Sequence, residues 1–115
     1  MRLYIAVLDE VPDFIVPTLV AHTMLGAHLE YTREYAANSN KGVNPYVNYC
    51  DWLADSFKKC VVRVNKKEFD KIAAIPYTYL GHENTTLGGM KSCAVPIPTR
   101  DLPNVLKFAK LWKPL

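Results

Sequence analysis

The sequence lacks an apolar run long enough to cross a membrane, which takes about 20 consecutive residues. The apolar stretch at residues 3–8 is short, and Asp9, Glu10 and Asp13 interrupt the chain after it. A secretory signal peptide needs a longer apolar segment and a cleavage site with small residues, and the sequence shows neither. We therefore expect a cytoplasmic protein that has no membrane partner.

Cysteine is also scarce. Cys50, Cys60 and Cys93 are three in number and form no Cys-x-x-Cys pair. An odd count without paired spacing argues against a disulfide scaffold and against a structural zinc site. His22 and His28 are six residues apart, so they lack the i, i+4 spacing that two metal ligands on a helix need. We expect no metal site, and we expect the cysteines to act as small apolar residues of the core.

Neither sign of charge is in large excess, because 14 basic and 11 acidic residues leave a net charge of +3. The two signs are nevertheless separated along the chain. Residues 1–56 carry 3 basic and 7 acidic side chains, whereas residues 57–115 carry 11 basic and 4 acidic ones. A basic half of this kind is typical of a protein that binds a polyanion such as a nucleic acid. The alternative interpretation is a charged face that is simply solvated. The candidate phosphate contacts are Lys58, Lys59, Arg63, Lys66, Lys67 and Lys71.

Strand-like and helix-like patterns alternate along the chain. The patterns predict four strands, near residues 3–8, 59–64, 77–81 and 92–97. They also predict four helices, near residues 17–37, 45–57, 66–74 and 103–111, with Asn65 capping the third. Helical connections between strands require a mostly parallel or mixed sheet that is covered on both faces. We therefore predict one α/β domain over residues 1–115, with three layers (α/β/α) and a four-stranded mixed sheet.

In a sheet of this kind the ligand site lies at the carboxyl ends of the strands. The segments that follow the first and third predicted strands are residues 9–17 and 81–89. The second of them carries His82, Glu83 and Thr86. A histidine beside a carboxylate can act as a general base, and a threonine hydroxyl can donate a hydrogen bond to an oxyanion. A polar loop exposed to solvent is the alternative interpretation.

Two segments of the chain match one known family in their order. The first is the helical segment at residues 20–27, which carries His22 and is followed by Gly26 and Ala27. The second is the polar loop at residues 82–86, which ends in Thr86. Together they resemble the type 2 peptidyl-tRNA hydrolase family, in which a strand leads into a histidine-bearing helix and a threonine loop precedes the last strand. The resemblance implies that the chain has the fold of this family and hydrolyses the ester between a peptide and tRNA. It also implies a homodimer that needs no cofactor.

Several positions depart from the family pattern. Phe14 and Ile15 stand where the family has a Gly-Lys pair, and Leu19 replaces a glutamine. In the loop, His82 replaces the acidic residue and Asn84 replaces a glycine. His22 and Thr86 therefore carry over from the family, and His82 or Glu83 would have to supply the missing acid.

Two hypotheses about function follow. The first is an enzyme that binds tRNA and hydrolyses a peptidyl or acyl ester of it, with His22, Thr86, His82 and Glu83 in the site. The second is a catalytically inactive relative that binds an RNA, a nucleotide or a protein as a regulator or inhibitor. For His22 taken alone, a histidine on a helix face that hydrogen-bonds a backbone carbonyl is a further interpretation.

Overall fold

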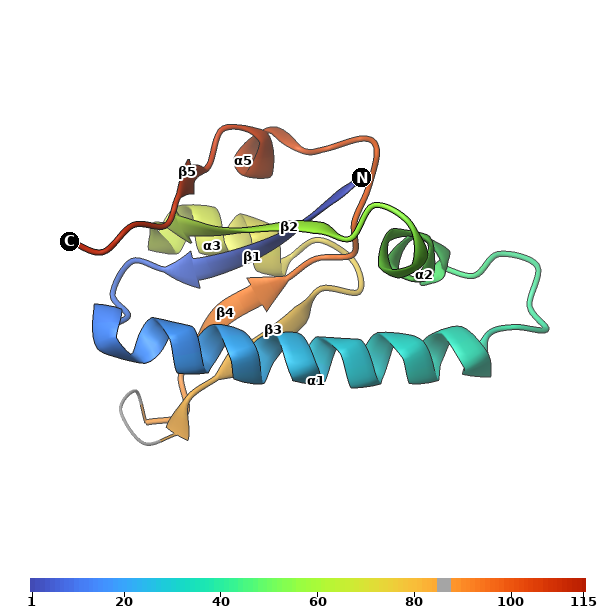
Figure 1. The fold of residues 1–115 in the computed structure, drawn as a ribbon, viewed down its shortest axis with the longest axis horizontal. Coiled ribbons are helices and arrows are strands. Elements are labelled where there is room, and N and C mark those ends of the chain that lie inside the picture. Colours follow the sequence, from blue (N-terminus) through green and yellow to red (C-terminus); the bar gives the residue numbers. More distant parts are fainter. Residues whose placement is uncertain (85–87) are drawn as a thin grey trace.

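The computed structural model describes residues 1–84 and 88–115, and a mixed five-stranded sheet forms its centre (Figure 1). In chain order the strands span Arg2–Leu8 (β1), Lys58–Val64 (β2), Tyr79–His82 (β3), Lys91–Val95 (β4) and Lys110–Leu111 (β5). Their order across the sheet is β3-β4-β1-β2-β5. Strands β1 and β2 pair in parallel, and the other pairings are antiparallel.

Helices lie on both sides of this sheet. They span Val16–Ala37 (α1), Val47–Ala54 (α2), Lys66–Ala73 (α3) and Asn104–Lys107 (α5), and a 3-10 turn (η1) spans Asp13–Ile15. Figure 1 shows α1 in front of the strands and α3 behind them. Because β1 lies between these layers, Leu3, Ala6 and Val7 have no exposed surface. The predicted α/β class and the mixed sheet are confirmed.

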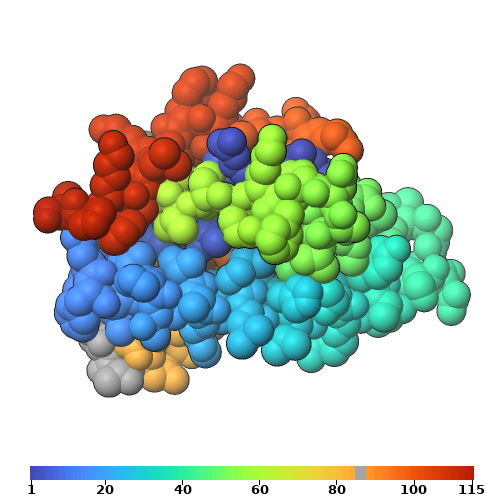
Figure 2. Space-filling view, viewed as in Figure 1, coloured from blue at the N-terminus to red at the C-terminus, as the bar shows by residue number. Residues whose placement is uncertain are grey.

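Helix α1 is the longest element and crosses the front of the molecule, directly below residues of α2 and β2 (Figure 2). Leu19, Thr23, Ala27 and Tyr31 recur every four residues and are all fully buried. This spacing places them on one stripe of the helix, which packs on the sheet. Pro17 lies in the first turn, where its missing N–H group does not break the helix.

Helix α3 begins as its sequence predicts. The Asn65 side chain accepts a hydrogen bond from the Glu68 N–H, and the Glu68 carboxylate accepts one from the Asn65 N–H, both at 2.8 Å. This capping box satisfies two N–H groups that the helix leaves without partners. Phe69 and Ile72 are buried, so the helix is fixed to the back of the sheet by a short apolar stripe.

The prediction of four strands is wrong, because a fifth strand completes the sheet. Residues 103–111 carry a helical pattern, but only Asn104–Lys107 form a helix and Lys110–Leu111 form β5. Leu111 pairs with Val62, and the Trp112 N–H donates to the Val61 carbonyl at 2.9 Å. Strand β2 would otherwise be an exposed edge with unpaired backbone groups. Pairing along this edge therefore outweighs the local helical preference of the sequence.

The third strand is also shorter at its start than its composition predicts. Tyr77 and Thr78 have high β propensity, but β3 begins only at Tyr79. Tyr77 has a φ angle of 65°, a left-handed conformation that interrupts an extended strand. The Tyr77 carbonyl lies 2.8 Å from the Tyr31 hydroxyl, a contact that holds this turn against α1.

A close approach of α1 to β3 depends on two glycines. A Cβ atom added to Gly26 would overlap the Tyr79 ring, and one added to Gly81 would overlap the Thr23 side chain. The Tyr31 hydroxyl lies 2.6 Å from the Val95 carbonyl and accepts a hydrogen bond from the Tyr79 N–H at 2.9 Å. Burial raises the pKa of Tyr31 well above its usual range, so the hydroxyl stays neutral.

No helix among the described residues is long and apolar enough to span a bilayer. All three cysteines are free thiols, as their number and spacing predict. Cys93 is fully buried in β4, and burial raises its pKa to about 12. Cys50 and Cys60 are only partly buried.

The α1–β3 contact generates a stability prediction. The variant Gly81→Ala forces a methyl group into buried Thr23, which itself donates to the Leu19 carbonyl at 2.8 Å. We expect the free energy of unfolding to fall by about 1–3 kcal/mol, the usual cost of overpacking a core. Urea denaturation followed by circular dichroism measures this change.

Gly42→Ala is the matched control, because no atom lies within 4 Å of the added Cβ. We expect that variant to be neutral or to be stabilised by up to about 1 kcal/mol. Equal effects of the two substitutions would contradict the close contact between Gly81 and Thr23.

Candidate functional site

A polar cleft of about 220 Å³ lies between the start of α1 and the end of β3. Its lining consists of Thr18, His22, His82, Glu83 and Asn84. The His22 and His82 ring centroids are 6.4 Å apart, and the rings meet edge to face at 69°. Two histidines that are far apart in the sequence therefore share one site. His82 and Glu83 are partly buried, whereas His22 and Asn84 are exposed.

The position of His22 follows from its place on α1. It precedes Thr23, which is fully buried against Gly81, so His22 lies beside the helix stripe that packs on the sheet. Thr18 lies four residues earlier, one helical turn away on the same flank. This flank of α1 faces the end of β3 and forms one wall of the cleft.

The sheet is irregular beside His82. Gly81 pairs with Cys93, but His82 pairs with Lys91, so the β3–β4 register shifts between Gly81 and His82. One extra residue, Ser92, lies on β4 at this point, so β4 is the bulged strand. Gly81 faces Thr23 of α1, and the next residue, His82, lines the cleft with His22.

A lysine on the neighbouring strand fixes the hydrogen-bonding state of His82. The Lys91 Nζ lies 3.1 Å from the His82 Nδ1. A lysine ammonium can only donate, so Nδ1 acts as the acceptor in this contact. A neutral ring with an acceptor at Nδ1 carries its hydrogen at Nε2. His82 therefore offers an N–H donor at Nε2 to a bound group.

The predicted site is thus partly assembled in the structure. His22, His82 and Glu83 line one cleft, at the carboxyl end of β3 where the topology places a ligand site. Thr86, the remaining predicted catalytic residue, lies outside the described residues. Thr18 and Asn84 also line the cleft, and no sequence argument singled them out for this role.

The basic block does not form one patch. Lys58 and Lys59 are neighbours on β2, so their side chains point to opposite faces of the sheet. Lys66, Lys67 and Lys71 lie on α3, behind the sheet (Figure 1). Of these three, Lys66 is paired with Asp70 at 2.7 Å, whereas Lys67 and Lys71 are exposed.

Arg63 is held by an acidic partner. Its guanidinium lies 3.0 Å from the Asp13 carboxylate and 2.6 Å from the Lys113 carbonyl. The Leu115 N–H and the Arg63 guanidinium both donate to Asp13, which lowers the pKa of that carboxyl below its ordinary value. Arg63 therefore fastens the C-terminal segment to η1, and it has less freedom than the α3 lysines to contact a phosphate.

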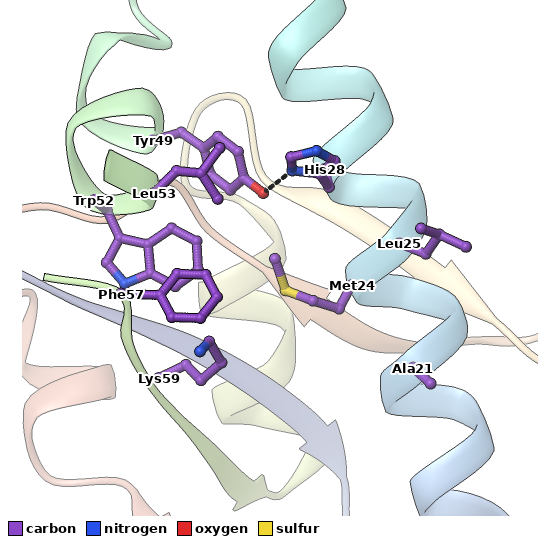
Figure 3. A pocket seen from close by; sticks show the side chains of 9 residues that line it. All are labelled: Ala21, Met24, Leu25, His28, Tyr49, Trp52, Leu53, Phe57 and Lys59. Atoms are coloured by element: carbon purple, nitrogen blue, oxygen red, sulfur yellow. Dashed lines mark hydrogen bonds between the residues drawn. The ribbon is translucent and has the colours of Figure 1, made fainter. Parts of the chain in front are cut away.

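A second cavity, larger and apolar, was not predicted from the sequence. It measures about 450 Å³ and lies between α1, α2 and the start of β2 (Figure 3). The Tyr46, Tyr49 and Trp52 pattern of α2 indicates a helix that packs by an aromatic face, but it does not reveal a space beside that face. The lining residues are Ala21, Met24, Leu25, His28, Tyr49, Trp52, Leu53, Phe57 and Lys59.

No family model, curated protein or solved structure shows a significant match to this chain. The described residues contain no group of three or more His, Cys, Asp or Glu side chains that could hold a metal ion.

The Lys91 contact predicts the tautomer of His82. We expect two-bond ¹⁵N–¹H correlation spectra of the neutral protein to show the His82 ring protonated at Nε2. In Lys91→Met, which removes the donor and keeps most of the chain length, both tautomers should be populated. The His28 signals serve as an internal control, since its Nδ1 contacts Tyr49 at 2.9 Å and not Lys91. A ring protonated at Nδ1 in the wild-type protein would contradict the assignment.

Proposed function

We propose that the cleft between α1 and β3 is a hydrolytic site for an ester, and that its substrate is a peptidyl or acyl ester of tRNA. The observation that carries the proposal is the convergence of His22 and His82 in one cleft, with Glu83 beside them. An imidazole that accepts a proton and a second that donates a hydrogen bond are the two elements that ester hydrolysis needs.

The two histidines divide the chemistry in this proposal. The His22 imidazole accepts a proton from a water molecule, whose oxygen attacks the ester carbonyl carbon. The His82 Nε2–H donates to the carbonyl oxygen as it becomes negative. When the tetrahedral intermediate collapses, the ribose oxygen leaves and takes the proton back from His22. The products are a tRNA with a free terminal hydroxyl and a carboxylic acid, which loses its proton to the solvent.

The choice of tRNA rests on two further supports. The first is the resemblance of residues 20–27 and 82–86 to the type 2 peptidyl-tRNA hydrolase family. The second is the exposed pair Lys67 and Lys71, which lie one helical turn apart on α3 and have no ion-pair partner among the described residues. By the same resemblance, the proposed hydrolase is a homodimer without a cofactor, and we place it in the cytoplasm as part of the proposal.

A second candidate function is a binding protein that keeps the cleft and lacks the chemistry. It is favoured by the residues at the start of α1. Leu19 is fully buried and Ile15 is partly buried, so neither position supplies a polar group to the cleft. In this alternative the cleft holds an RNA, a nucleotide or a protein segment and regulates or inhibits its partner.

Hydrolysis is tested by the release of free tRNA from a labelled peptidyl-tRNA. We expect His22→Gln and His82→Gln each to lower the rate by about a hundredfold or more, the usual loss for a general base or an oxyanion donor. Thr86→Ala should have a comparable effect if the threonine carries the role that the resemblance implies. Urea denaturation of each variant shows whether the fold is retained.

Arg33→Gln is the matched control, because Arg33 is an exposed residue of α1 that does not line the cleft. We expect it to keep the wild-type rate. Wild-type turnover no faster than the buffer blank would reject the hydrolase, and retained tRNA binding in that case would support the binding protein.

Binding of tRNA is tested separately from hydrolysis. Phosphate contacts release counterions, so the affinity should fall steeply as salt rises. We expect the double variant Lys67→Glu/Lys71→Glu to weaken binding and to reduce the slope of log affinity against log salt by about two. Arg33→Glu/Lys41→Glu, at two exposed basic residues outside α3, is the control because it makes the same change of net charge. An unchanged slope in the double variant would show that α3 does not contact the RNA.

A further inference from the structure

The apolar cavity lies apart from the polar cleft. Both have a wall on α1, but they share no residue. Thr18 and His22 flank one side of the buried helix stripe, and Met24 and His28 flank the other. The cavity is therefore a separate site with its own chemistry. Its volume of about 450 Å³ falls within the range of small-molecule pockets, which is roughly 300–1,000 Å³.

The cavity walls are apolar, and its two ends differ. Met24 points into the space between α1 and the stacked pair of Trp52 and Phe57, whose ring centroids are 5.4 Å apart (Figure 3). At one end the His28 Nδ1 lies 2.9 Å from the Tyr49 hydroxyl. At the opposite end of the view stands Lys59.

Lys59 supplies the one cationic group among the lining residues that carries a permanent charge. Its Nζ lies 3.4 Å from the centre of the Phe57 ring and 5.6 Å from that of Trp52. The ion pairs of the described residues join Arg63 to Asp13 and Lys66 to Asp70, so Lys59 has no carboxylate partner there. Cation–π contacts with these two rings hold the Lys59 ammonium at the cavity, where it can pair with an anion.

The backbone at Phe57 is unusual and serves this arrangement. Phe57 has a φ angle of 55°, which costs free energy in a residue with a bulky side chain. Phe57 is 53% exposed, so its burial in the core offsets only part of that strain. The left-handed conformation places the Phe57 ring against Trp52 and under the Lys59 ammonium. Strain of this kind is concentrated at ligand sites.

We propose that this cavity binds a small amphipathic monocarboxylate. The apolar body of the ligand lies between Met24 of α1 and the Trp52–Phe57 pair, and its carboxylate pairs with the Lys59 ammonium. Burial raises the pKa of Tyr49 to about 12, so the hydroxyl at the far end stays neutral and faces the apolar body. A cationic ligand of the same shape would meet Lys59 as a like charge.

Two probes that differ only in the sign of their charge test the proposal. Decanoate and decylammonium carry the same apolar chain, and both are used below their micelle concentrations in isothermal titration calorimetry. We expect the wild-type protein to bind decanoate and to bind decylammonium at least about tenfold more weakly. Lys59→Glu should reverse this preference, whereas Lys58→Glu, the neighbouring reversal on the other face of β2, should keep it.

A second pair of variants tests the role of the Phe57 ring. Phe57→Gly removes the ring, and glycine adopts a φ angle of 55° without strain, so the variant should fold and lose decanoate binding. Tyr77→Gly makes the same change at the other left-handed aromatic residue, away from the cavity, and should bind as the wild type does. Equal binding of the two probes, no binding of decanoate, or unchanged binding in Lys59→Glu would each overturn the proposal.

Discussion

The close contact of α1 with β3 is the constraint on which the front of the molecule depends. Side chains are absent at Gly26 and Gly81, so the Tyr79 ring fits against the helix and Thr23 fits against the strand. The Tyr31 hydroxyl then joins α1 to the backbone of both β3 and β4. Because His22 adjoins Thr23 and His82 adjoins Gly81, the same contact brings the two histidines together. A core packing interaction thereby sets the geometry of the polar cleft.

Helix α1 also separates two environments of opposite character. On the flank toward β3 it presents Thr18 and His22 to a polar cleft, and on the flank toward α2 it presents Met24 to an apolar cavity. The buried stripe between the flanks fixes the rotation of the helix about its axis. Neither site can therefore be reshaped by turning α1 without loss of the core. The two sites therefore share α1 as a wall.

The sequence was informative where local patterns decide the structure. Runs of β-forming residues and helical patterns located four of the strands and the three longer helices, and Asn65 identified the start of α3. The pattern failed at residues 110–111, because the free edge of β2 and not the local sequence selects a strand there. The family resemblance and the polar loop singled out His22, His82 and Glu83 as site residues, but their proximity depends on the close packing of α1 on β3, which no local pattern predicts. The apolar cavity was missed for a related reason: the Trp52 aromatic pattern is the same whether its neighbours fill the space or leave it open.

The start of α1 limits which residues can act in the cleft. Val16 and Leu19 are buried in the core, so a polar side chain at either position would lose its hydration without gaining a partner there. An unsatisfied buried polar group costs about 1–3 kcal/mol. A glutamine in place of Leu19, where the resembled family has one, is therefore disfavoured by the way this helix packs. The polar groups of the cleft come from the flank of the helix and from the end of β3 instead. The packing of α1 therefore leaves His22, on its flank, and His82, on β3, as the histidines that can act in the cleft.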